Sequence, residues 1–207
     1  MRQHVNPLSQ FFQKEYAIPN INNLYEYSHL PLHLDIGCGN GEYLLDLAQS
    51  NEDINYLGVE IRYRVIKNSL SQIENMELKN VNFIFGNANV SLGDWLKLLP
   101  KGILNSVSIQ FPDPWFKKRH HKRRVLQPKL LQDIISSLDL HKEIYIQSDV
   151  YGVFEYMDQL IISSNRFMKD NNKESLLTFN KNNLITQREK YVKYKGMPIY
   201  SQKYLRI

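Results

Sequence analysis

Three polar side chains stand at positions where they could bind a cofactor that contains a nucleoside. Asp35 ends a short apolar run, and Glu60 ends another one 25 residues later. A carboxylate at the end of a strand can accept hydrogen bonds from both hydroxyls of a ribose, which is the role that we expect for Glu60. Asn87 follows a third apolar run, and its amide could bind the edge of an adenine. Together these side chains predict a site for an adenosine group.

The loop after Asp35 contains three glycines, Gly37, Gly39 and Gly41, and glycine permits a tight turn close to a ligand. Their spacing differs from the dinucleotide-binding pattern G-x-G-x-x-G, because the third glycine comes one residue early and Glu42 stands in its place. The Asp35 carboxylate would repel a phosphate but would attract an ammonium or sulfonium group. The pattern therefore fits S-adenosylmethionine better than NAD.

The stretch 106–124 reads SVSIQFPDPWFKKRHHKRR and combines features suited to handling a base on a polyanion. Alternating apolar residues predict a strand, and two prolines end it and restrict the backbone around Asp113. Trp115 could stack on a base or brace the loop, and we favour the bracing role. Six basic residues follow, and we expect all of them on a surface that faces nucleic acid: Lys117, Lys118, Arg119, Lys122, Arg123 and Arg124.

The net charge of the 207 residues is +5, and the positive charge is concentrated in two segments. The run 117–124 has six Lys/Arg and no acidic residue, and residues 181–207 have seven Lys/Arg and one acidic residue. The rest of the chain is therefore acidic. Such concentrated charge favours a polyanionic partner, although a solvated basic loop would have the same composition.

The single cysteine, the histidines and the apolar runs limit the possible classes of protein further. The single cysteine, Cys38, allows no internal disulfide and no cysteine-based metal site, and we expect it to fill space in the glycine loop. His120 and His121 lack spaced ligand partners, so we expect no metal. No run approaches the roughly 20 apolar residues of a membrane span, and the N-terminal stretch has no apolar signal core. We therefore expect a cytoplasmic protein without a membrane partner.

Apolar runs alternate with amphipathic segments along the chain and predict an α/β fold. The predicted strands are 32–37, 55–60, 81–87, 107–111 and 143–149, with 175–180 and 198–205 as a closing antiparallel pair. The predicted helices are 40–50 (capped by Asn40), a second that ends near 76, 92–99, 128–138, 153–163 and 186–195 (capped by Thr186). This alternation indicates a mostly parallel sheet whose strands end at one edge, where ligands bind. We expect residues 1–30 to form an N-terminal arm and residues 31–207 a single domain.

Several motifs together resemble the tRNA (guanine-N7-)-methyltransferase family. They are LDIGCGNGEYLLDLA, YLGVEI, FIFGNA, SIQFPDPWFKKRHHKRR, SD at 148–149 and TQRE at 186–189, and they occur in the family's order and spacing. The resemblance implies a Rossmann-like methyltransferase sheet, mostly parallel and seven-stranded with an antiparallel last strand, and with helices on both faces. It also implies methyl transfer from S-adenosylmethionine to N7 of a guanine in tRNA, at position 46 in the variable loop.

The resemblance assigns roles to individual residues. It implies that Asp35, Glu60, Asn87 and Asp113 bind S-adenosylmethionine together with the loop glycines, and that Asp113 lies next to the reacting guanine as the catalytic residue. Two of these differ from many members, which have Glu at the position of Asp35 and Asp at that of Asn87. The residues that match substrate-contacting positions are Lys117, Asp149, Thr186, Gln187, Arg188 and Glu189.

Three other functions remain as alternatives. Another nucleobase methyltransferase would use a related proline-rich turn, but here Asp113 interrupts the prolines and a basic run follows. A non-catalytic RNA-binding protein would retain a dead cofactor pocket, which the intact Asp35, glycine loop and Glu60 disfavour. An NAD-dependent oxidoreductase is disfavoured by the glycine spacing. We expect a monomer or a homodimer.

Overall fold

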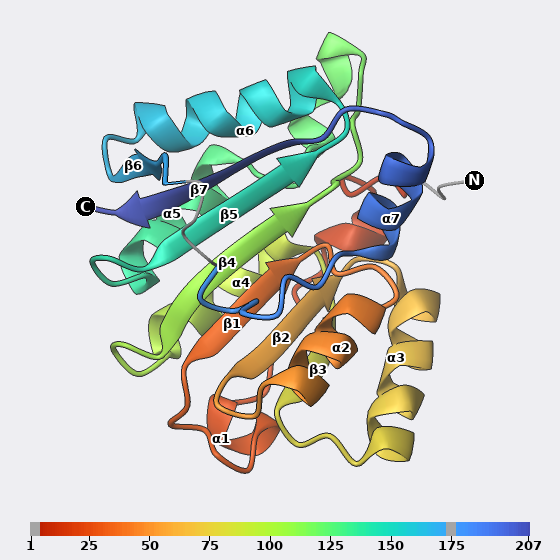
Figure 1. Ribbon diagram of the computed structural model, residues 1–207, viewed down its shortest axis with the longest axis vertical. Coiled ribbons are helices and arrows are strands. Elements are labelled where there is room, and N and C mark those ends of the chain that lie inside the picture. Colours follow the sequence, from red (N-terminus) through yellow and green to blue (C-terminus); the bar gives the residue numbers. More distant parts are fainter. Residues whose placement is uncertain (1–4, 173–176) are drawn as a thin grey trace.

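A single twisted sheet organises the computed structural model, which describes residues 5–172 and 177–207. Within these residues seven strands pair in the order β3-β2-β1-β4-β5-β7-β6 (Figure 1). The first five strands in the chain are parallel, and β7 is antiparallel to both of its neighbours. The strands are β1 (Leu32–Ile36), β2 (Asn55–Glu60), β3 (Val81–Phe85), β4 (Leu104–Gln110), β5 (Glu143–Ser148), β6 (Phe167–Asp170) and β7 (Tyr200–Arg206). The predicted sheet with an antiparallel last strand is confirmed.

Helices cover both faces of the sheet, with α2 and α3 in front and α4 and α5 behind in Figure 1. Along β1, Leu34 and Ile36 pack with α4, α5 and α6, whereas Tyr56 and Phe83 of β2 and β3 pack with α2 and α3. The helices are α1 (Ile21–Leu24), α2 (Glu42–Ser50), α3 (Tyr63–Met76), α4 (Ala88–Leu98), α5 (Pro128–Ser137), α6 (Tyr151–Ser163) and α7 (Gln187–Tyr194), with 3-10 turns η1 (Gln10–Gln13) and η2 (Lys118–Arg123). In the described ranges, none of the helices has the length and apolar character that crossing a bilayer requires.

Some predicted elements differ from the structure. Helix α2 begins one residue later than predicted, because Gly41 rather than Asn40 occupies its N-cap position. Helix α4 begins at Ala88 rather than Leu92, because the side chain of Asn87 caps it by accepting from the N–H of Asn89 (3.1 Å).

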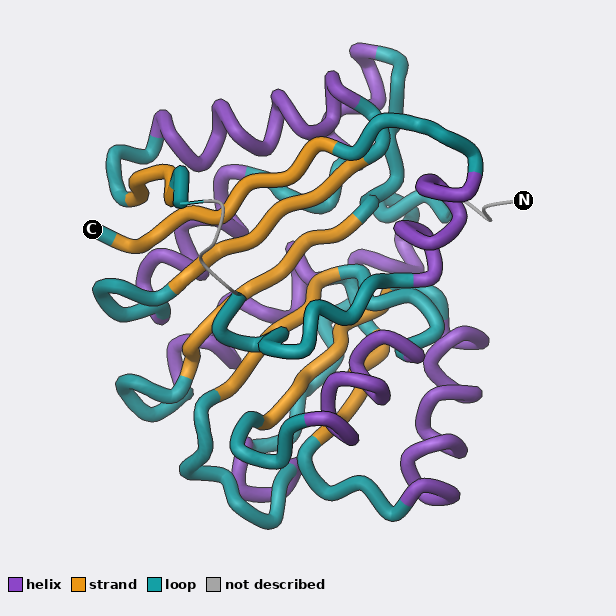
Figure 2. The backbone as a smooth tube through the Cα atoms, viewed as in Figure 1, coloured by secondary structure: helices purple, strands orange, loops and turns teal. Residues whose placement is uncertain are grey.

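The predicted strand 175–180 is wrong for its described part, and residues 173–176 lie outside the described residues. Residues 177–180 form a turn closed by a single bridge between Leu177 and Asn180. The strand that pairs with β7 on the side away from β5 is β6. The apolar character of this segment has another cause: Phe179 is fully buried and stacks on the His33 ring at 3.7 Å. Figure 2 shows the segment as a loop that crosses in front of the strands before it reaches α7.

The N-terminal residues pack closely on the body of the protein. Ile21 and Tyr25 belong to the main hydrophobic core, and the Tyr25 hydroxyl donates to the carbonyl oxygen of Tyr56 (2.8 Å). The indole N–H of Trp95 donates to the carbonyl oxygen of Pro19 (2.9 Å). Residues before η1 then reach the edge at which the parallel strands end, where α7 also lies (Figure 1).

Candidate active site

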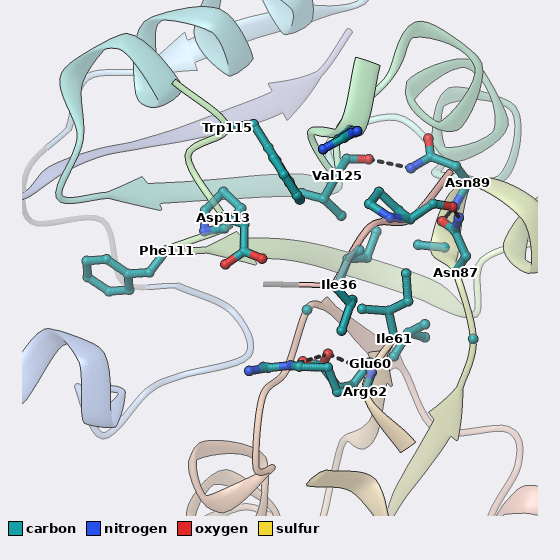
Figure 3. A pocket seen from close by; sticks show the side chains of 18 residues that line it. Ile36, Glu60, Ile61, Arg62, Asn87, Asn89, Phe111, Asp113, Trp115 and Val125 are labelled. Carbon is teal, nitrogen blue, oxygen red and sulfur yellow. Dashed lines mark hydrogen bonds and ion pairs between the residues drawn. The ribbon is translucent and has the colours of Figure 1, made fainter. Parts of the chain in front are cut away.

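A pocket opens at the carboxyl ends of β1 to β4, where ligands bind in sheets of this type (Figure 3). It encloses about 840 Å³ of empty space, part of it open to solvent. Residues from the strand ends, the N-terminal arm and the stretch 106–124 line it, including Val5, Pro7, Gly37, Glu60, Arg62, Asn87, Ala88, Asp113, Trp115 and Arg123. The pocket therefore joins segments that are far apart in the sequence.

The glycine loop adopts a backbone that other residues rarely take. Gly37, Gly39 and Gly41 all have positive φ angles, of 87°, 62° and 74°. A Cβ on Gly41 would lie 2.5 Å from the Phe83 ring, whereas a Cβ on either of the other two would meet open space. The predicted tight turn is thus present, and the backbone at Gly37 and Gly39 has open space beside it. Burial raises the pKa of the Cys38 thiol, which keeps it protonated and consistent with a space-filling role.

The Glu60 carboxylate is held from two directions. Arg62 donates from Nε to Oε1 (2.8 Å) and from Nη2 to Oε2 (2.9 Å), and the N–H of Gly39 donates to Oε2 (3.1 Å). The hydrogen bonds and charge of Glu60, with a smaller contribution from Asp113, raise the pKa of the Arg62 guanidinium. The backbone N–H of Arg62 also donates to Oε1 (3.0 Å). Because a carboxylate has about four acceptor positions, all four are occupied, and a ribose at this strand end would have to displace one of these donors.

Asn87 connects the pocket to the N-terminal arm. Its amide nitrogen donates to the carbonyl oxygens of Pro7 (3.1 Å) and Phe12 (3.2 Å), and its oxygen caps α4. The arm is also held by Phe85, whose ring lies 4.7 Å from that of Tyr16. The predicted contact of Asn87 with an adenine stays a prediction, and the structure adds a contact with the arm.

Asp35 is buried at the end of a directed chain of hydrogen bonds. Ser108 Oγ donates to Asp35 Oδ1 (2.6 Å), His33 Nε2 lies 3.0 Å from Ser108 Oγ, and His33 Nδ1 lies 2.8 Å from Ser106 Oγ. A serine hydroxyl has one proton. Since Ser108 gives its proton to Asp35, His33 must donate from Nε2 and accept from Ser106 at Nδ1.

Burial shifts the pKa values of both titratable groups in this hydrogen-bond network, His33 and Asp35, in favour of their neutral forms. It lowers the pKa of His33 to about 3, so that the ring is neutral. It raises the pKa of Asp35 to about 6, against hydrogen bonding by Ser108 that lowers it. Asp35 is thus a carboxylate at neutral pH that would gain from a cationic partner, as expected for a residue near an ammonium or sulfonium group.

Asp113 lies on a strained turn at the end of β4. Phe111 and Trp115 have positive φ angles of 47° and 41°, which are unusual for residues other than glycine. The N–H of Phe111 donates to the carbonyl oxygen of Gln147 on β5 (2.7 Å), which anchors the turn to the sheet. Figure 3 shows the Asp113 carboxylate directed to the side of the pocket where Glu60 and Arg62 lie. The turn therefore fixes a carboxylate at the pocket.

Trp115 is packed by residues of the basic run that follows it. The Arg123 guanidinium lies 5.0 Å from the centre of the indole, and the His120 ring meets the indole edge-on at 5.8 Å. Since the indole also lines the pocket, it forms part of the pocket wall and braces the loop behind it.

The basic run divides into exposed and buried residues, and the prediction that all six face nucleic acid is wrong for Arg124. Arg124 is only 8% exposed, stacks over Tyr156 at 4.7 Å and donates to the carbonyl oxygen of Gly152 (3.4 Å). It therefore connects the run to α6. Four basic side chains are exposed: Lys117, Lys118, Arg119 and Lys122.

The predicted substrate residues near the C-terminus gather around the first turn of α7. Arg188 forms an ion pair with the buried carboxylate of Asp149, and Gln147 Nε2 donates to Glu189 Oε2 (3.1 Å). Thr186 caps the helix by accepting from the N–H of Glu189 (3.0 Å), as predicted. Gln187 donates to Oε2 of Glu42 on α2 (2.7 Å).

The structure thus places the predicted residues in two groups. Asp149 pairs with Arg188, and Thr186 and Glu189 contact each other in the same helical turn, while Lys117 is exposed on the basic run and takes part in none of these contacts. In the described part of the chain, no group of three or more His, Cys, Asp or Glu side chains is placed to hold a metal ion. His121 instead lies 3.1 Å from the Arg124 guanidinium.

Sequence reasoning missed several residues of the site. Arg62 was not predicted, although its position two residues after Glu60 could have indicated a local ion pair. Gln147 and the arm residues Val5 and Pro7 gave no usable signal, because only the tertiary fold brings them to the strand ends.

Comparison with solved structures supports the fold. The structure titled "Structure of an Antibiotic Related Methyltransferase" has a TM-score of 0.57 and 17% identity, and the match covers 95% of this chain and 97% of that one. A SAM-dependent methyltransferase from Aquifex aeolicus has a TM-score of 0.55 and 14% identity, with coverage of 89% and 85%. The fold is therefore that of the Rossmann-like methyltransferases, and the pocket lies at the edge where open α/β sheets bind ligands.

Sequence comparisons are more specific. A family model described as "Putative methyltransferase" matches residues 29–202. The tRNA (guanine-N(7)-)-methyltransferase of Prochlorococcus marinus strain NATL2A is 46% identical over all of this chain and 97% of the relative. That of Synechococcus sp. strain CC9311 is also 46% identical, over 97% of this chain and 85% of the relative. The chain belongs to the tRNA (guanine-N(7)-)-methyltransferase family.

Proposed function

We propose that this protein transfers the methyl group of S-adenosylmethionine to N7 of a guanine in tRNA, and that this guanine is at position 46 in the variable loop. One observation of the site supports this most directly: the strained turn of β4 places the Asp113 carboxylate in the same pocket as the glycine loop and Glu60. The names of the full-length relatives support the same reaction.

The residues of the pocket fit S-adenosylmethionine. Glu60 would accept hydrogen bonds from the ribose hydroxyls in place of one of the donors that Arg62 and Gly39 now supply. The open backbone at Gly37 and Gly39 leaves room for a ligand. The buried carboxylate of Asp35 suits the ammonium group of the methionine part. Asn87 would shape the adenine side of the pocket, because it fixes the arm there.

The bound cofactor supplies an electrophilic methyl group on a sulfonium sulfur. Guanine N7 has a free lone pair and carries no proton, so the protein needs no general base. Its residues must instead align the guanine and exclude water. Positive charge develops on the purine, and the fixed carboxylate of Asp113 stabilises it. The strained backbone at Phe111 and Trp115 holds this carboxylate before the substrate arrives.

Exposed basic residues would bind the tRNA. Lys117, Lys118, Arg119 and Lys122 are exposed beside the turn that carries Asp113, and they would neutralise phosphates and supply most of the non-specific affinity. The guanine itself would be splayed from its stack to reach the pocket, as is usual for sequence-specific contacts with RNA.

The cellular setting follows from the substrate. We propose that the protein acts on tRNA in the cytoplasm, as a monomer or a homodimer.

Incubation of the purified protein with tRNA and S-adenosylmethionine tests the proposal. The tRNA is then cleaved chemically at N7-methylguanine, and the cleavage site is mapped. We expect cleavage at the variable-loop guanine, and none in a tRNA in which adenine replaces that guanine. Methyl transfer without cleavage at this position would contradict the assigned target.

A further inference from the structure

Helix α7 presents an unusual outer face. Of its eight residues only Val192 is buried, and two aromatic side chains point to solvent: Tyr191 is 49% exposed and Tyr194 is 83% exposed. Tyr194 is the most exposed aromatic side chain in the described part of the chain. Neither ring therefore adds much to the core, although a large apolar ring in solvent gives up the stabilisation that burial would bring.

Cations and rings alternate along this face. The Arg188 guanidinium lies 5.1 Å from the centre of the Tyr191 ring, and Lys195 Nζ lies 5.9 Å from Tyr191 and 5.4 Å from Tyr194. This series of contacts starts at the first turn of α7, where Arg188 also pairs with the buried carboxylate of Asp149. It runs outward over about 9 Å from Arg188 to Tyr194, given a rise of about 1.5 Å per helical residue.

The charge of this face complements a polyanion. Lys190 and Lys195 are exposed, and Lys193 is exposed but pairs with Glu189 (2.7 Å), the one acidic residue of the segment. Basic side chains interleaved with exposed aromatic rings form the usual platform for unpaired nucleotides, whose phosphates are neutralised while their bases stack. A duplex offers no free base faces for such stacking.

We propose that the outer face of α7 binds unpaired nucleotides of the tRNA next to the target guanine. Tyr191 and Tyr194 stack on bases, and Lys190 and Lys195 neutralise phosphates. The inference rests on the proposed function, because tRNA is the partner that must approach this edge. Tyr191 and Tyr194 are neighbours at i and i+3, about 5–6 Å apart at their Cβ atoms, so that one short run of nucleotides can contact both.

The test compares tRNA affinities of Tyr194→Ala, Tyr194→Phe and wild type by filter binding between about 50 and 200 mM salt. The loss of one stacking partner should weaken binding by about fivefold or more at every salt concentration, without a change in the salt slope. Tyr194→Phe keeps the ring and should bind as wild type. Lys195→Ala should instead reduce the slope by about one unit.

Tyr27→Ala is the matched control. Tyr27 is 55% exposed, and its carbonyl accepts from Asn55 at the start of β2, so it lies at the opposite edge of the sheet. This variant should bind tRNA as wild type does. Unchanged tRNA affinity for Tyr194→Ala would overturn the inference and leave the face to another partner such as a protein.

Methyl transfer by the wild type, measured on the same preparation, separates this inference from the proposed function. A wild type that binds tRNA but does not methylate it would contradict the proposed function, whereas the affinities of the Tyr194 variants would still decide the role of α7. Binding of S-adenosylmethionine to Tyr194→Ala should match wild type, which excludes misfolding as the cause of a weaker tRNA complex.

Discussion

At the scale of single residues, the carboxylates at this edge of the sheet have different surroundings, and only Glu60 and Asp113 of the three line the pocket. Asp113 is half-buried on a turn whose flanking residues have strained backbones, whereas Asp35 is buried and receives a hydrogen bond from Ser108. Glu60 is shared by Arg62 and Gly39. These environments suit the different roles that we propose: stabilisation of charge in the reaction by Asp113, and cofactor binding by the other two.

Replacement of Asp113 by Ala or Asn should reduce kcat by about a hundredfold or more and leave tRNA affinity unchanged, because it removes a charge that acts on the developing cation. Asp113→Asn keeps the shape of the side chain and isolates the charge. Single-turnover methyl transfer with saturating tRNA and S-adenosylmethionine measures the effect, and Asp53→Asn on an exposed loop serves as the control. Turnover equal to wild type would remove Asp113 from the mechanism.

Removal of the charge of Asp35 should raise the stability of the fold but weaken the binding of the cofactor. Burial raises its pKa to about 6 from an ordinary value of 3.8. The unfolded state therefore ionises first as pH rises, and the buried carboxylate costs stability progressively from about pH 4 to pH 6 and constantly above. Asp35→Asn keeps an acceptor for Ser108 and removes this cost.

We expect Asp35→Asn to be about 1–3 kcal/mol more stable than wild type at pH 7, with no difference below about pH 4. Urea unfolding at several pH values measures this difference. The same variant should bind S-adenosylmethionine at least about tenfold more weakly, because it lacks the charge that pairs with an ammonium group. A variant that is less stable at pH 7 and binds the cofactor normally would contradict this account of Asp35.

At the scale of elements, local patterns predicted most strand ends correctly. The alternation of apolar residues located β1 and β2, and therefore placed Asp35 and Glu60 at the edge of the sheet. Asn87 was placed near a strand end, but its capping of α4 was missed because the cap depends on a side-chain rotamer rather than on a pattern. The loop containing Phe179 was misread as a strand, since a buried ring in a crossing loop has the same apolar signature as a strand residue.

The basic run shows why residue type alone could not predict which basic side chains are exposed. Lys122 and Arg124 are two residues apart in one segment, yet Lys122 is exposed and Arg124 packs on Tyr156. Sequence composition could not separate them, because the separation follows from where the 3-10 turn η2 meets α6.

Single substitutions should distinguish the two residues. Arg124→Ala should lower the free energy of unfolding by about 1–3 kcal/mol, since it removes a buried stacking contact and leaves the Gly152 carbonyl without its donor. Lys122→Ala should leave stability unchanged and weaken tRNA binding only. Thermal unfolding and filter binding of both variants measure this. Equal stabilities for the two would contradict the structural role of Arg124.

At the scale of the whole molecule, the fold brings the basic run and the basic residues of α7 to one edge of the sheet, whereas Lys203 and Arg206 lie toward the other end of β7. The basic run follows β4 at the carboxyl edge of the sheet, and α7 lies at the same edge (Figure 1). Two segments more than 60 residues apart in the sequence therefore present one basic edge around the pocket. Such an arrangement attracts a polyanion to the edge that holds the candidate active site.

If this arrangement matters, the effect of removing a positive charge on tRNA binding should depend on which edge of the sheet the residue occupies. Replacement of Lys118, Arg119 and Lys122 by Ala should reduce the salt slope of tRNA binding by about two to three units, because each phosphate contact contributes roughly 0.7–0.9 unit. Lys101→Ala is the control, since this exposed lysine precedes β4 at the opposite edge and should leave the slope unchanged. Filter binding over a range of salt concentrations measures both. An equal effect per charge at the two edges would show that net charge, and not its placement by the fold, determines tRNA affinity.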